Sequence, residues 1–524
     1  MTRQHMLDQL EAHTKEWDIC IIGGGATGLG TAIDAASRGY KTLLLEQCDF
    51  AKGTSSRSTK LVHGGVRYLQ QGNIKLVTEA LKERGLLRQN APHLVKDQSF
   101  IVPNYKWWEG PFYGIGLKIY DWMAGSLGLG PSRLLDKEET LALAPTLDGE
   151  GLRGGVLYHD GQFDDARLAI NLAATAAEQG GVLLNYMPVT GLLKTGGRVK
   201  GVQLKDALTG KGYEVMTKVV INATGVFSDA VLDMDEPGHE SIIAPSQGIH
   251  LVFDKAFLPG SAAVLVPHTD DGRVLFAVPW HNKIIAGTTD TPVAPKDNAS
   301  LLEPRAMEEE INFVLDTIGK YLTKDPERAD IKSVFAGLRP LVKGNAKNTA
   351  ALSRDHHIEI SQSGLITITG GKWTTYRKMS EDTVNIAARR AGLPEKECAT
   401  AHLKIHGWKQ GVDFDRDMYY YGSDEAGIDA LIKNDPQLAT PIHAQLPYTA
   451  ATIVWAVQNE MCMTVEDALS RRTRALLLDA KAAIEAAPAV AAIMAGQMQK
   501  DNAWVQEQVN TFTALAKQYL PDGL

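Results

Sequence analysis

The sequence predicts an α/β protein in which a Rossmann-like nucleotide-binding unit is assembled from separated parts of the chain. Three observations carry this prediction. Residues 18–47 read as strand, glycine turn, helix and strand, and two further apolar strands followed by glycine-containing turns lie within 218–229 and 364–377. Residues 400–524 are rich in Ala, Leu, Glu and Lys at helical spacing, which predicts a helical C-terminal domain.

Size and composition are those of a multidomain globular protein. A chain of 524 residues predicts two or three domains, and 44% hydrophobic with 22% charged residues is typical of soluble proteins. The net charge of -8 argues against a nucleic-acid partner. Residues 1–17 lack the apolar core of a signal peptide, and no apolar run reaches the ~18 residues that a membrane-spanning helix needs.

No metal site is predicted. The four cysteines, at positions 20, 48, 398 and 462, are too scattered for a zinc pattern and indicate a reduced compartment without disulfides. The acidic run 413–424 resembles the start of a calcium loop, but its sixth residue is Met418 and its twelfth is Asp424, where such loops have Gly and Glu. We read this run as a polar turn before a helix.

The first element is a βαβ unit. An apolar strand over 19–22 leads into a Gly-x-Gly-x-x-Gly turn at Gly23, Gly25 and Gly28, and a helix follows. The first glycine permits a tight turn, the second lets the backbone approach a pyrophosphate, and the third lets helix and strand pack closely. The helix N-terminus then presents free N–H groups to the phosphates.

The second strand of this unit, 42–45, ends at Glu46. A carboxylate there can accept hydrogen bonds from a ribose hydroxyl, and it disfavours the 2′-phosphate of NADP. FAD and NAD both remain open from the βαβ unit alone. The two later strand-and-glycine turns, with Ala223-Thr224-Gly225 in the first, indicate a discontinuous cofactor domain and therefore favour FAD.

Residues 54–68, TSSRSTKLVHGGVRY, form a segment that is rich in hydrogen-bond donors. It has five hydroxyl side chains, a glycine pair, and basic or imidazole side chains at Arg57, Lys60, His63 and Arg67. Such a segment is suited to holding one or more anions.

Taken together, these motifs resemble the FAD-dependent glycerol-3-phosphate dehydrogenases, within the wider D-amino-acid-oxidase-like flavoproteins. The resemblance rests on the βαβ unit, on TSSRSTKLVHGGVRYL, and on YHDGQFDDARLAI (158–170), VVINATG, IIAGTTDT (284–291), FAGLRPL (335–341), GGKWTTYR and TVEDALSRRTRALL (464–477). One departure is Leu29, where the family usually has a smaller residue, and we expect only a local packing difference there.

The resemblance implies the domain organisation and the cofactor contacts. It places a discontinuous FAD-binding domain at 16–75, 150–235 and 345–398, an inserted antiparallel-sheet substrate domain at 76–149 and 236–344, and a C-terminal helical domain at 399–524. The residues that it implies for FAD are Gly23, Gly25, Thr27, Gly28, Glu46, Thr54, Ser55, Ser56, Leu61, His63, Gly64, Val189, Ala223, Gly225, Trp373 and Thr374.

For the substrate, the resemblance implies sn-glycerol 3-phosphate, oxidised at C2 to dihydroxyacetone phosphate. Because guanidinium groups match phosphate oxygens, we expect Arg339 to hold the phosphate together with Arg67, Tyr68 and Arg354. His250 is our first candidate for the base that takes the hydroxyl proton, although a core histidine on an alternating strand is the alternative. Lys372 is the second candidate, either as base or as a charge beside the flavin. The sequence does not decide between them.

The resemblance further implies that the electrons pass to a membrane quinone. An oxidase that reduces oxygen to hydrogen peroxide is the sibling alternative, and a flavoprotein-like scaffold without catalysis belongs to a different class. Residues 107–127 combine aromatic side chains with few charges, which suits a membrane interface as well as an interior helix. We expect a cytoplasmic enzyme that associates peripherally with the inner face of the cell membrane, and the family also allows a homodimer.

Overall fold

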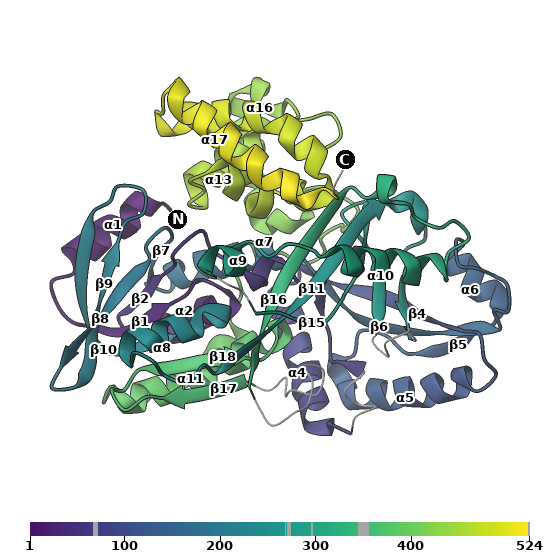
Figure 1. Cartoon of the computed structure of the whole chain (residues 1–524), viewed down its shortest axis with the longest axis horizontal. Helices are drawn as coiled ribbons and strands as arrows, with labels where there is room; N and C mark the ends of the chain where they lie inside the picture. Colours follow the sequence, from purple (N-terminus) through teal and green to yellow (C-terminus); the bar gives the residue numbers. More distant parts are fainter. Residues whose placement is uncertain (67–71, 268, 270–273, 295–296, 344–355, 522–524) are drawn as a thin grey trace.

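The computed structural model describes residues 1–66, 72–267, 269, 274–294, 297–343 and 356–521. Figure 1 shows a body that contains two sheets, with a group of C-terminal helices packed on top of it. This arrangement confirms the predicted α/β class with a helical C-terminal domain.

The first sheet is the Rossmann-like one. Its strands run in the order β17-β18-β10-β1-β2-β7, and the parallel pairs β1–β10, β1–β2, β2–β7 and β10–β18 form its centre. The hairpin β8–β9 continues antiparallel from β10. The strand bounds are β1 (Trp17–Ile22), β2 (Thr42–Leu45), β7 (Val182–Leu184), β8 (Val189–Thr195), β9 (Arg198–Lys205), β10 (Gly212–Asn222), β17 (His356–Ile360) and β18 (Ile366–Gly370).

Helices cover this sheet: β2 and β7 are buried along their whole length, and β1 is buried except at Asp18. Helix α2 packs between α7 and α11, and α8 lies near the β8–β10 end (Figure 1). The helices of this part are α1 (Arg3–Ala12), α2 (Ala26–Ser37), α7 (Asp165–Glu178), α8 (Ser228–Asp235) and α11 (Tyr376–Arg390).

The second sheet is mostly antiparallel and follows the order β15-β11-β14-β13-β12-β4-β6-β3, with β16 paired to β11 and β5 to β6. Its strands are β3 (Leu61–Val62), β4 (Val95–Asn104), β5 (Arg133–Leu135), β6 (Gly154–Phe163), β11 (Ile243–Asp254), β12 (Ala263–Val266), β13 (Leu275–Trp280), β14 (Lys283–Gly287), β15 (Thr291–Pro292) and β16 (Ser333–Val342). Both β3 and β6 fall in ranges that we assigned to the FAD-binding domain, yet they pair within this sheet. The domain boundaries stay a prediction.

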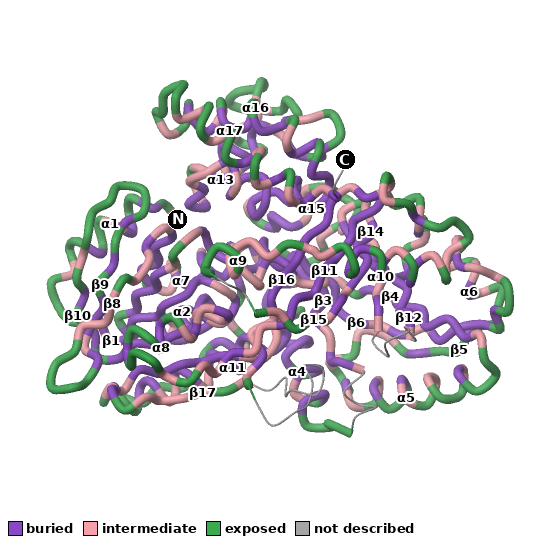
Figure 2. Tube along the Cα trace, viewed as in Figure 1, coloured by how far each residue is buried: buried purple, intermediate pink, exposed green. Residues whose placement is uncertain are grey.

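The helices beside the second sheet are α4 (Ile74–Asn90), α5 (Glu109–Ala124), α6 (Lys137–Leu143), α9 (Asn298–Leu302) and α10 (Glu308–Gly319). Within the described ranges, no helix combines the length and the apolar character that crossing a bilayer requires. Figure 2 shows that most strands of the second sheet are buried, whereas long stretches of α5 are exposed.

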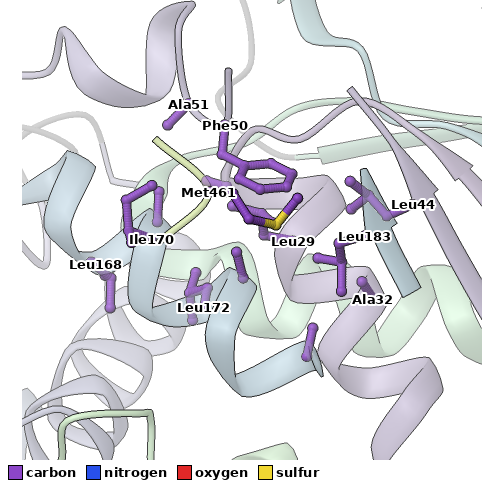
Figure 3. Packing of buried hydrophobic residues seen from close by; sticks show 14 of the residues in the cluster. Leu29, Ala32, Leu44, Phe50, Ala51, Leu168, Ile170, Leu172, Leu183 and Met461 are labelled. Atoms are coloured by element: carbon purple, nitrogen blue, oxygen red, sulfur yellow. The ribbon is translucent and has the colours of Figure 1, made fainter. Parts of the chain in front are cut away.

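The C-terminal helices are α12 (Glu425–Asn434), α13 (Ala450–Asn459), α14 (Val465–Asp467), α15 (Ala475–Leu478), α16 (Ala480–Met498) and α17 (Asn502–Ala516). They share a continuous core with the first sheet. Figure 3 shows Met461 of this region beside Leu29 of α2, Phe50 and Leu183. Leu29, the departure from the family pattern, is fully buried there.

A buried ionic contact also ties the C-terminal helices to the loop that follows β2. A single π-helical turn, Ala468–Arg472, directs two consecutive arginines onto Asp49. Arg471 Nε lies 2.6 Å from Asp49 Oδ2, and Arg472 donates to both carboxylate oxygens at 2.7 and 2.8 Å. All three side chains are buried. The contact fixes the loop immediately after Glu46.

Candidate active site

One large cavity of about 1350 Å³ is bounded by parts of both sheets. The glycine turn after β1, the loop 51–59, the strand β16 and the turn after β18 all contribute to its wall. At one end the cavity reaches apolar side chains of α5. The volume exceeds that of ordinary small-ligand pockets, so the cavity has room for a dinucleotide and a small substrate together.

The glycine turn is shaped for close backbone approach. Gly23 has a φ of +111°, and a Cβ there would lie 2.6 Å from the carbonyl oxygen of Ala223. A Cβ on Gly28 would lie 1.9 Å from the carbonyl oxygen of Gly23. Gly23 and Gly25 line the cavity, whereas Gly28 packs beneath the turn. Gly25 is the N-cap of α2, so the positive end of that helix points to the cavity.

Glu46 lies at the end of β2 and lines the cavity, as the βαβ pattern predicts. Its Oε2 accepts from the backbone N–H of Gly24 at 2.6 Å, and its Oε1 accepts from that of Cys48 at 2.9 Å. Burial raises the pKa of Glu46, and these two donors act against that increase. Each carboxylate oxygen has a further lone pair that a ribose hydroxyl can use.

The donor-rich segment after Gly53 is divided between the cavity and the interior. Thr54, Ser55, Leu61 and His63 line the cavity. Ser56 is buried, and its carbonyl oxygen accepts from Lys60 at 2.7 Å and from Arg474 at 2.8 Å. Gly64 packs against Leu81 and Tyr120. The segment therefore contributes only part of its predicted residues to the cavity wall.

Two basic side chains of this segment are paired with carboxylates, of which Glu303 is half-buried and Asp165 is buried. Arg57 pairs with Glu303 at 2.7 Å, and Lys60 pairs with Asp165 at 2.7 Å. Burial lowers the pKa of Lys60 to about 8, with the Asp165 charge acting in the opposite direction. Our interpretation of the segment as an anion holder is thus not supported for Arg57 and Lys60, because their charges are already balanced within the protein.

The other cofactor residues inferred from the resemblance also lie around the cavity, where Thr27, Val189, Ala223, Gly225, Trp373 and Thr374 line its wall. The Trp373 indole N–H donates to the Ser55 carbonyl oxygen at 2.9 Å, and the His63 backbone N–H donates to Thr374 Oγ1 at 3.2 Å. These contacts join the turn after β18 to the donor-rich segment, although more than 300 residues separate the two.

Arg339 lies on β16 and faces the same cavity. Its guanidinium donates to Thr288 Oγ1 at 3.1 Å and to the carbonyl oxygens of Thr289 at 2.9 Å and Gln247 at 3.2 Å. Among the ion pairs of the described residues, its partner is Asp290, whose Oδ1 is 3.4 Å away. The side chain is 20% exposed. These contacts orient the guanidinium at the cavity wall.

His250 lies on β11, the strand paired with β16, and it also lines the cavity. Its ring stacks on Phe335 with centroids 4.8 Å apart, and its Nε2 is 2.9 Å from Thr59 Oγ1. Burial lowers the pKa of His250 well below its usual value, and the positive charges of Lys60 and Arg339 lower it further. The imidazole is therefore neutral near pH 7, as a proton acceptor has to be.

Lys372 lines the cavity at the turn after β18. Gly370 and Gly371 precede it with φ values of +77° and +73°, and a short 3-10 turn, Trp373–Thr375, leads into α11. A lysine beside a helix start places positive charge at this wall. Arg67, Tyr68 and Arg354 lie outside the described residues.

Two contacts and the full extent of the cavity were not predicted from the sequence. Thr59 contacts His250, and Thr288 contacts Arg339, but in each case the partner is distant along the chain. The cavity also extends to Trp108, Phe112 and Ile119 around α5. The aromatic run 107–127 was a signal for an apolar surface, although not for its connection to the cavity. No group of three metal-ligating side chains occurs among the described residues.

The residues present fit an FAD molecule. A turn without room for a Cβ, a helix N-terminus and an acidic strand end match the needs of a dinucleotide diphosphate and ribose. The wall at Trp373, Thr374 and Leu61 provides apolar and hydrogen-bonding surface for a flat ring. The space left between this wall and Arg339 suits a small anionic substrate.

The chain is similar to known flavoproteins. Residues 18–377 match the family described as FAD dependent oxidoreductase, and residues 367–505 match the C-terminal domain of alpha-glycerophosphate oxidase. The mitochondrial glycerol-3-phosphate dehydrogenase of Homo sapiens is 41% identical over 95% of this chain and 73% of its own length. The enzyme of the same name from Schizosaccharomyces pombe is 37% identical over 96% of this chain and 87% of its own length.

Solved structures give the same picture. The structure of glycerol-3-phosphate dehydrogenase from Bacillus halodurans complexed with FAD superposes with a TM-score of 0.81. It is 30% identical and covers 100% of this chain and 99% of its own. The FAD-bound L-alpha-glycerophosphate oxidase from Mycoplasma pneumoniae is 16% identical with a TM-score of 0.57 over 74% of this chain and 98% of its own, a likeness of fold alone.

Proposed function

This chain belongs to the FAD-dependent oxidoreductase family, and from that membership we propose that it oxidises sn-glycerol 3-phosphate to dihydroxyacetone phosphate and passes the electrons to a membrane quinone. Membership confirms the resemblance inferred from the sequence. FAD is the cofactor, and the enzyme is an FAD-dependent dehydrogenase.

The observation that carries the substrate proposal is that one cavity joins the glycine turn to Arg339 and His250. A cation and a neutral imidazole on paired strands provide the two functions that a phosphorylated secondary alcohol needs, phosphate binding and proton removal. The names of the relatives from Homo sapiens and Bacillus halodurans point to the same substrate.

When bound, FAD supplies the acceptor for the hydride from C2. The protein's part is to orient the substrate and to move the hydroxyl proton. We propose that Arg339 binds the phosphate, with Arg67, Tyr68 and Arg354 assigned to the same role from the resemblance. His250 takes the proton, and Lys372 stabilises negative charge that develops at this wall of the cavity.

For the cofactor, we propose that Gly23, Gly25 and the N-terminus of α2 hold the diphosphate and that Glu46 holds a ribose hydroxyl. The flat ring rests against the wall formed by Leu61, His63, Trp373 and Thr374. Ser56, Gly28 and Gly64 support these contacts from behind the wall, because they pack into the interior.

The apolar end of the cavity supports quinone as the electron acceptor. Side chains of α5 line the cavity, and other side chains of the same helix are exposed on the surface. A lipid-soluble acceptor can use such a continuous apolar path. The oxidase alternative is not favoured, because the relatives in the comparisons that span nearly the whole chain are named dehydrogenases.

The exposed side chains around α5 also support membrane contact. Trp107 is 77% exposed, Ile115 66% and Trp122 82%. Large apolar side chains gathered on one surface commonly mark an interaction site, and tryptophan suits the membrane–water interface. We propose that the enzyme is cytoplasmic and binds peripherally, through α5, to the inner face of the cell membrane.

One experiment tests the substrate and the catalytic role together. The FAD-loaded protein is mixed anaerobically with glycerol 3-phosphate, and flavin absorbance is followed in a stopped-flow instrument. Glycerol, lactate and an amino acid serve as comparison substrates. We expect rapid bleaching only with glycerol 3-phosphate. Equal bleaching by unphosphorylated alcohols contradicts the phosphate-binding assignment, and no bleaching by any of them contradicts the function.

The acceptor is tested with the reduced enzyme. Reoxidation by a soluble quinone is compared with reoxidation by oxygen, and hydrogen peroxide is measured. We expect quinone to reoxidise the flavin faster, with little peroxide. Stoichiometric peroxide at a comparable rate supports the oxidase instead.

A further inference from the structure

Thr59 lies at the contact between the cavity and His250. It is half-buried and lines the cavity, and its Oγ1 is 2.9 Å from His250 Nε2. The two residues are 191 positions apart in the chain. Because both residues line the cavity, the hydroxyl that contacts the imidazole nitrogen also borders the space in which a substrate can bind.

The backbone around Thr59 is held in place by one buried carboxylate. Asp165 Oδ2 accepts from the Ser58 N–H at 3.0 Å, from the Ser58 hydroxyl at 2.7 Å and from Lys60 Nζ at 2.7 Å. Lys60 has a φ of +63°, a left-handed conformation that non-glycine residues seldom adopt. With both neighbours fixed to Asp165, Thr59 has a defined direction toward His250.

The other ring nitrogen of His250 is closed off. Nδ1 is buried and has no hydrogen-bond partner among the described residues, and the ring face is covered by Phe335. Of the two nitrogens, Nε2 is the one with a hydroxyl contact, and that hydroxyl belongs to Thr59. Thr59 Oγ1 is therefore a hydroxyl that connects the cavity with Nε2 of His250.

We propose that Thr59 is a catalytic residue that relays the substrate hydroxyl proton to His250. This inference rests on the proposed function. The O–H bond of the alcohol breaks as its proton moves to Thr59 Oγ1, and the Thr59 proton moves to Nε2. The C2–H bond breaks with its electron pair leaving for the cofactor, and the C2=O double bond forms. The alcohol is oxidised by two electrons, FAD is reduced, and the imidazole becomes a cation.

The charges around His250 are compatible with this relay. The ring starts neutral, because burial and the charges of Lys60 and Arg339 disfavour its protonated form. Lys60 pairs with Asp165 at 2.7 Å, and Arg339 pairs with Asp290 at 3.4 Å. A dianionic phosphate at Arg339 would offset that charge, so that His250 becomes a better proton acceptor when substrate is bound.

A pair of substitutions separates the hydroxyl from the shape of the side chain. Thr59→Val is nearly isosteric and lacks the hydroxyl, whereas Thr59→Ser keeps it. We expect Thr59→Val to slow anaerobic flavin reduction by about 100-fold and Thr59→Ser to stay within about tenfold of the original rate. Thr511→Val, at an exposed position on α17, is the control that leaves the rate unchanged. A Thr59→Val rate equal to that of the unaltered protein overturns the relay.

Isotope effects test whether two protons move together. The reduction rate is measured in mixtures of H₂O and D₂O and plotted against the D₂O fraction. We expect a curved plot for the unaltered protein and for Thr59→Ser. A straight line indicates one proton in flight and contradicts the relay. Substrate deuterated at C2 serves as the control. Its kinetic isotope effect shows that the measured rate includes breaking of the C2–H bond, and the relay predicts this effect in every variant.

A measurement without cofactor tests the contact itself. Nitrogen-15 NMR of histidine-labelled, FAD-free protein reports the hydrogen bonding of Nε2, and His250→Asn identifies the signal. We expect the signal to shift in Thr59→Val and to be retained in Thr59→Ser. An unshifted signal contradicts the contact. If glycerol 3-phosphate fails to bleach the unaltered enzyme while this shift is seen, the proposed function fails and the contact stands.

Discussion

Arg339 and His250 are the two side chains on which the proposed chemistry depends most directly. They lie on paired strands and face one cavity, so binding of the phosphate and removal of the proton are coupled in space. Arg339 donates to the Thr288 hydroxyl and to the Thr289 carbonyl oxygen, and the Asp290 carboxylate lies 3.4 Å away. Its side chain is 20% exposed and lines the cavity, where an anionic ligand can reach it.

We predict that Arg339→Ala lowers kcat/KM for glycerol 3-phosphate by about 10- to 150-fold, the value of about 1.5–3 kcal/mol for a charge-assisted hydrogen bond. FAD should stay bound, since Arg339 does not belong to the glycine turn. Steady-state kinetics and the ratio of flavin to protein absorbance measure both effects. Arg416→Ala is the control, because that side chain is 62% exposed and pairs only with Glu425 among the contacts described. Unchanged kcat/KM in Arg339→Ala would remove Arg339 from the site.

We predict that kcat/KM declines at acidic pH, as His250 becomes protonated, only below the usual pKa of a histidine. Burial, Lys60 and Arg339 lower the pKa of His250, and a base is active when it is deprotonated. Activity should therefore persist as the pH falls through about 6.5. The measurement is kcat/KM from pH 5 to 8 for the unaltered protein and for His250→Asn. The substrate phosphate ionises equally in both, so the difference belongs to His250. If kcat/KM already declines with an apparent pKa above 6.5, and His250→Asn removes that decline, the prediction is contradicted.

At the residue scale, local patterns allowed part of the site to be predicted. Gly23, Gly25 and Glu46 follow from the order of residues within one βαβ unit, and the structure places them on the cavity wall. Thr59 was not predicted, because its partner His250 comes from a different strand far along the chain. The neutralisation of Lys60 by Asp165 was not predicted for the same reason.

At the scale of elements, the turn after β1 is tightly packed, whereas helix α5 is partly uncovered. The turn has no space for an additional carbon at Gly23, whereas α5 leaves large apolar side chains uncovered. Both were recognisable in the sequence, the first by glycine spacing and the second by its aromatic run. Their connection through one cavity depends on tertiary packing, which the sequence did not reveal.

We predict that Gly23→Ala yields a folded protein that has lost most of its FAD. The added Cβ would lie 2.6 Å from the Ala223 carbonyl oxygen, and alanine disfavours a φ of +111°. The ratio of flavin to protein absorbance after purification is the measurement. The matched control is Gly180→Ala, with a φ of +88° and no atom within 4 Å, which should cost about 1 kcal/mol of stability and keep FAD. Stoichiometric FAD in Gly23→Ala contradicts the role of the turn.

We predict that Trp107→Glu and Trp122→Glu weaken binding to phospholipid vesicles by at least about tenfold each, because each removes a large apolar side chain from the contact. Neither residue lines the main cavity, so reduction of a soluble dye should continue at its original rate. Co-sedimentation with vesicles measures the binding. Leu208→Glu, at a 42% exposed position in the turn between β9 and β10, is the control. Equal vesicle binding by all variants would exclude α5 as the membrane contact.

At the scale of the whole molecule, ionic contacts join the C-terminal helices to the loop that follows β2 and to the cavity wall. Arg471 and Arg472 hold Asp49, while Glu466 pairs with Lys52 at 2.7 Å, and Lys52 lines the cavity. Composition and helical spacing predicted a helical domain at 399–524. They did not predict its ionic contacts with residues near 50, because charged side chains far apart in the sequence leave no periodic signal.

We predict that Asp49→Asn destabilises the protein by about 3–5 kcal/mol, because it breaks buried ion pairs to both Arg471 and Arg472, although Arg471 keeps Glu466 and Asp467 as partners. Urea unfolding with and without FAD measures the loss, and Asp316→Asn, exposed on α10, is the control. Burial alone would raise the pKa of Asp49, but the charges of Arg472 and Arg471 outweigh it and hold the pKa well below its usual range.

The sign of the associated pH dependence follows from that lowered pKa. The contribution of Asp49 to stability is present above its unfolded pKa of about 3.9 and is lost as the pH falls toward the folded value. Acid unfolding should thus be less steep in Asp49→Asn than in the unaltered protein. Parallel acid-unfolding curves would show that the arginine pair does not stabilise this carboxylate.

The contact between Asp49 and Arg471 also bears on how the chain is made. The two residues are 422 positions apart. At about 5–20 residues per second, roughly 20–80 s of synthesis separate their emergence from the ribosome. During that interval the nascent N-terminal lobe carries an acidic side chain destined for the interior without its eventual counter-ions. That interval ends when Arg471 and Arg472 emerge, before α16 and α17 are made.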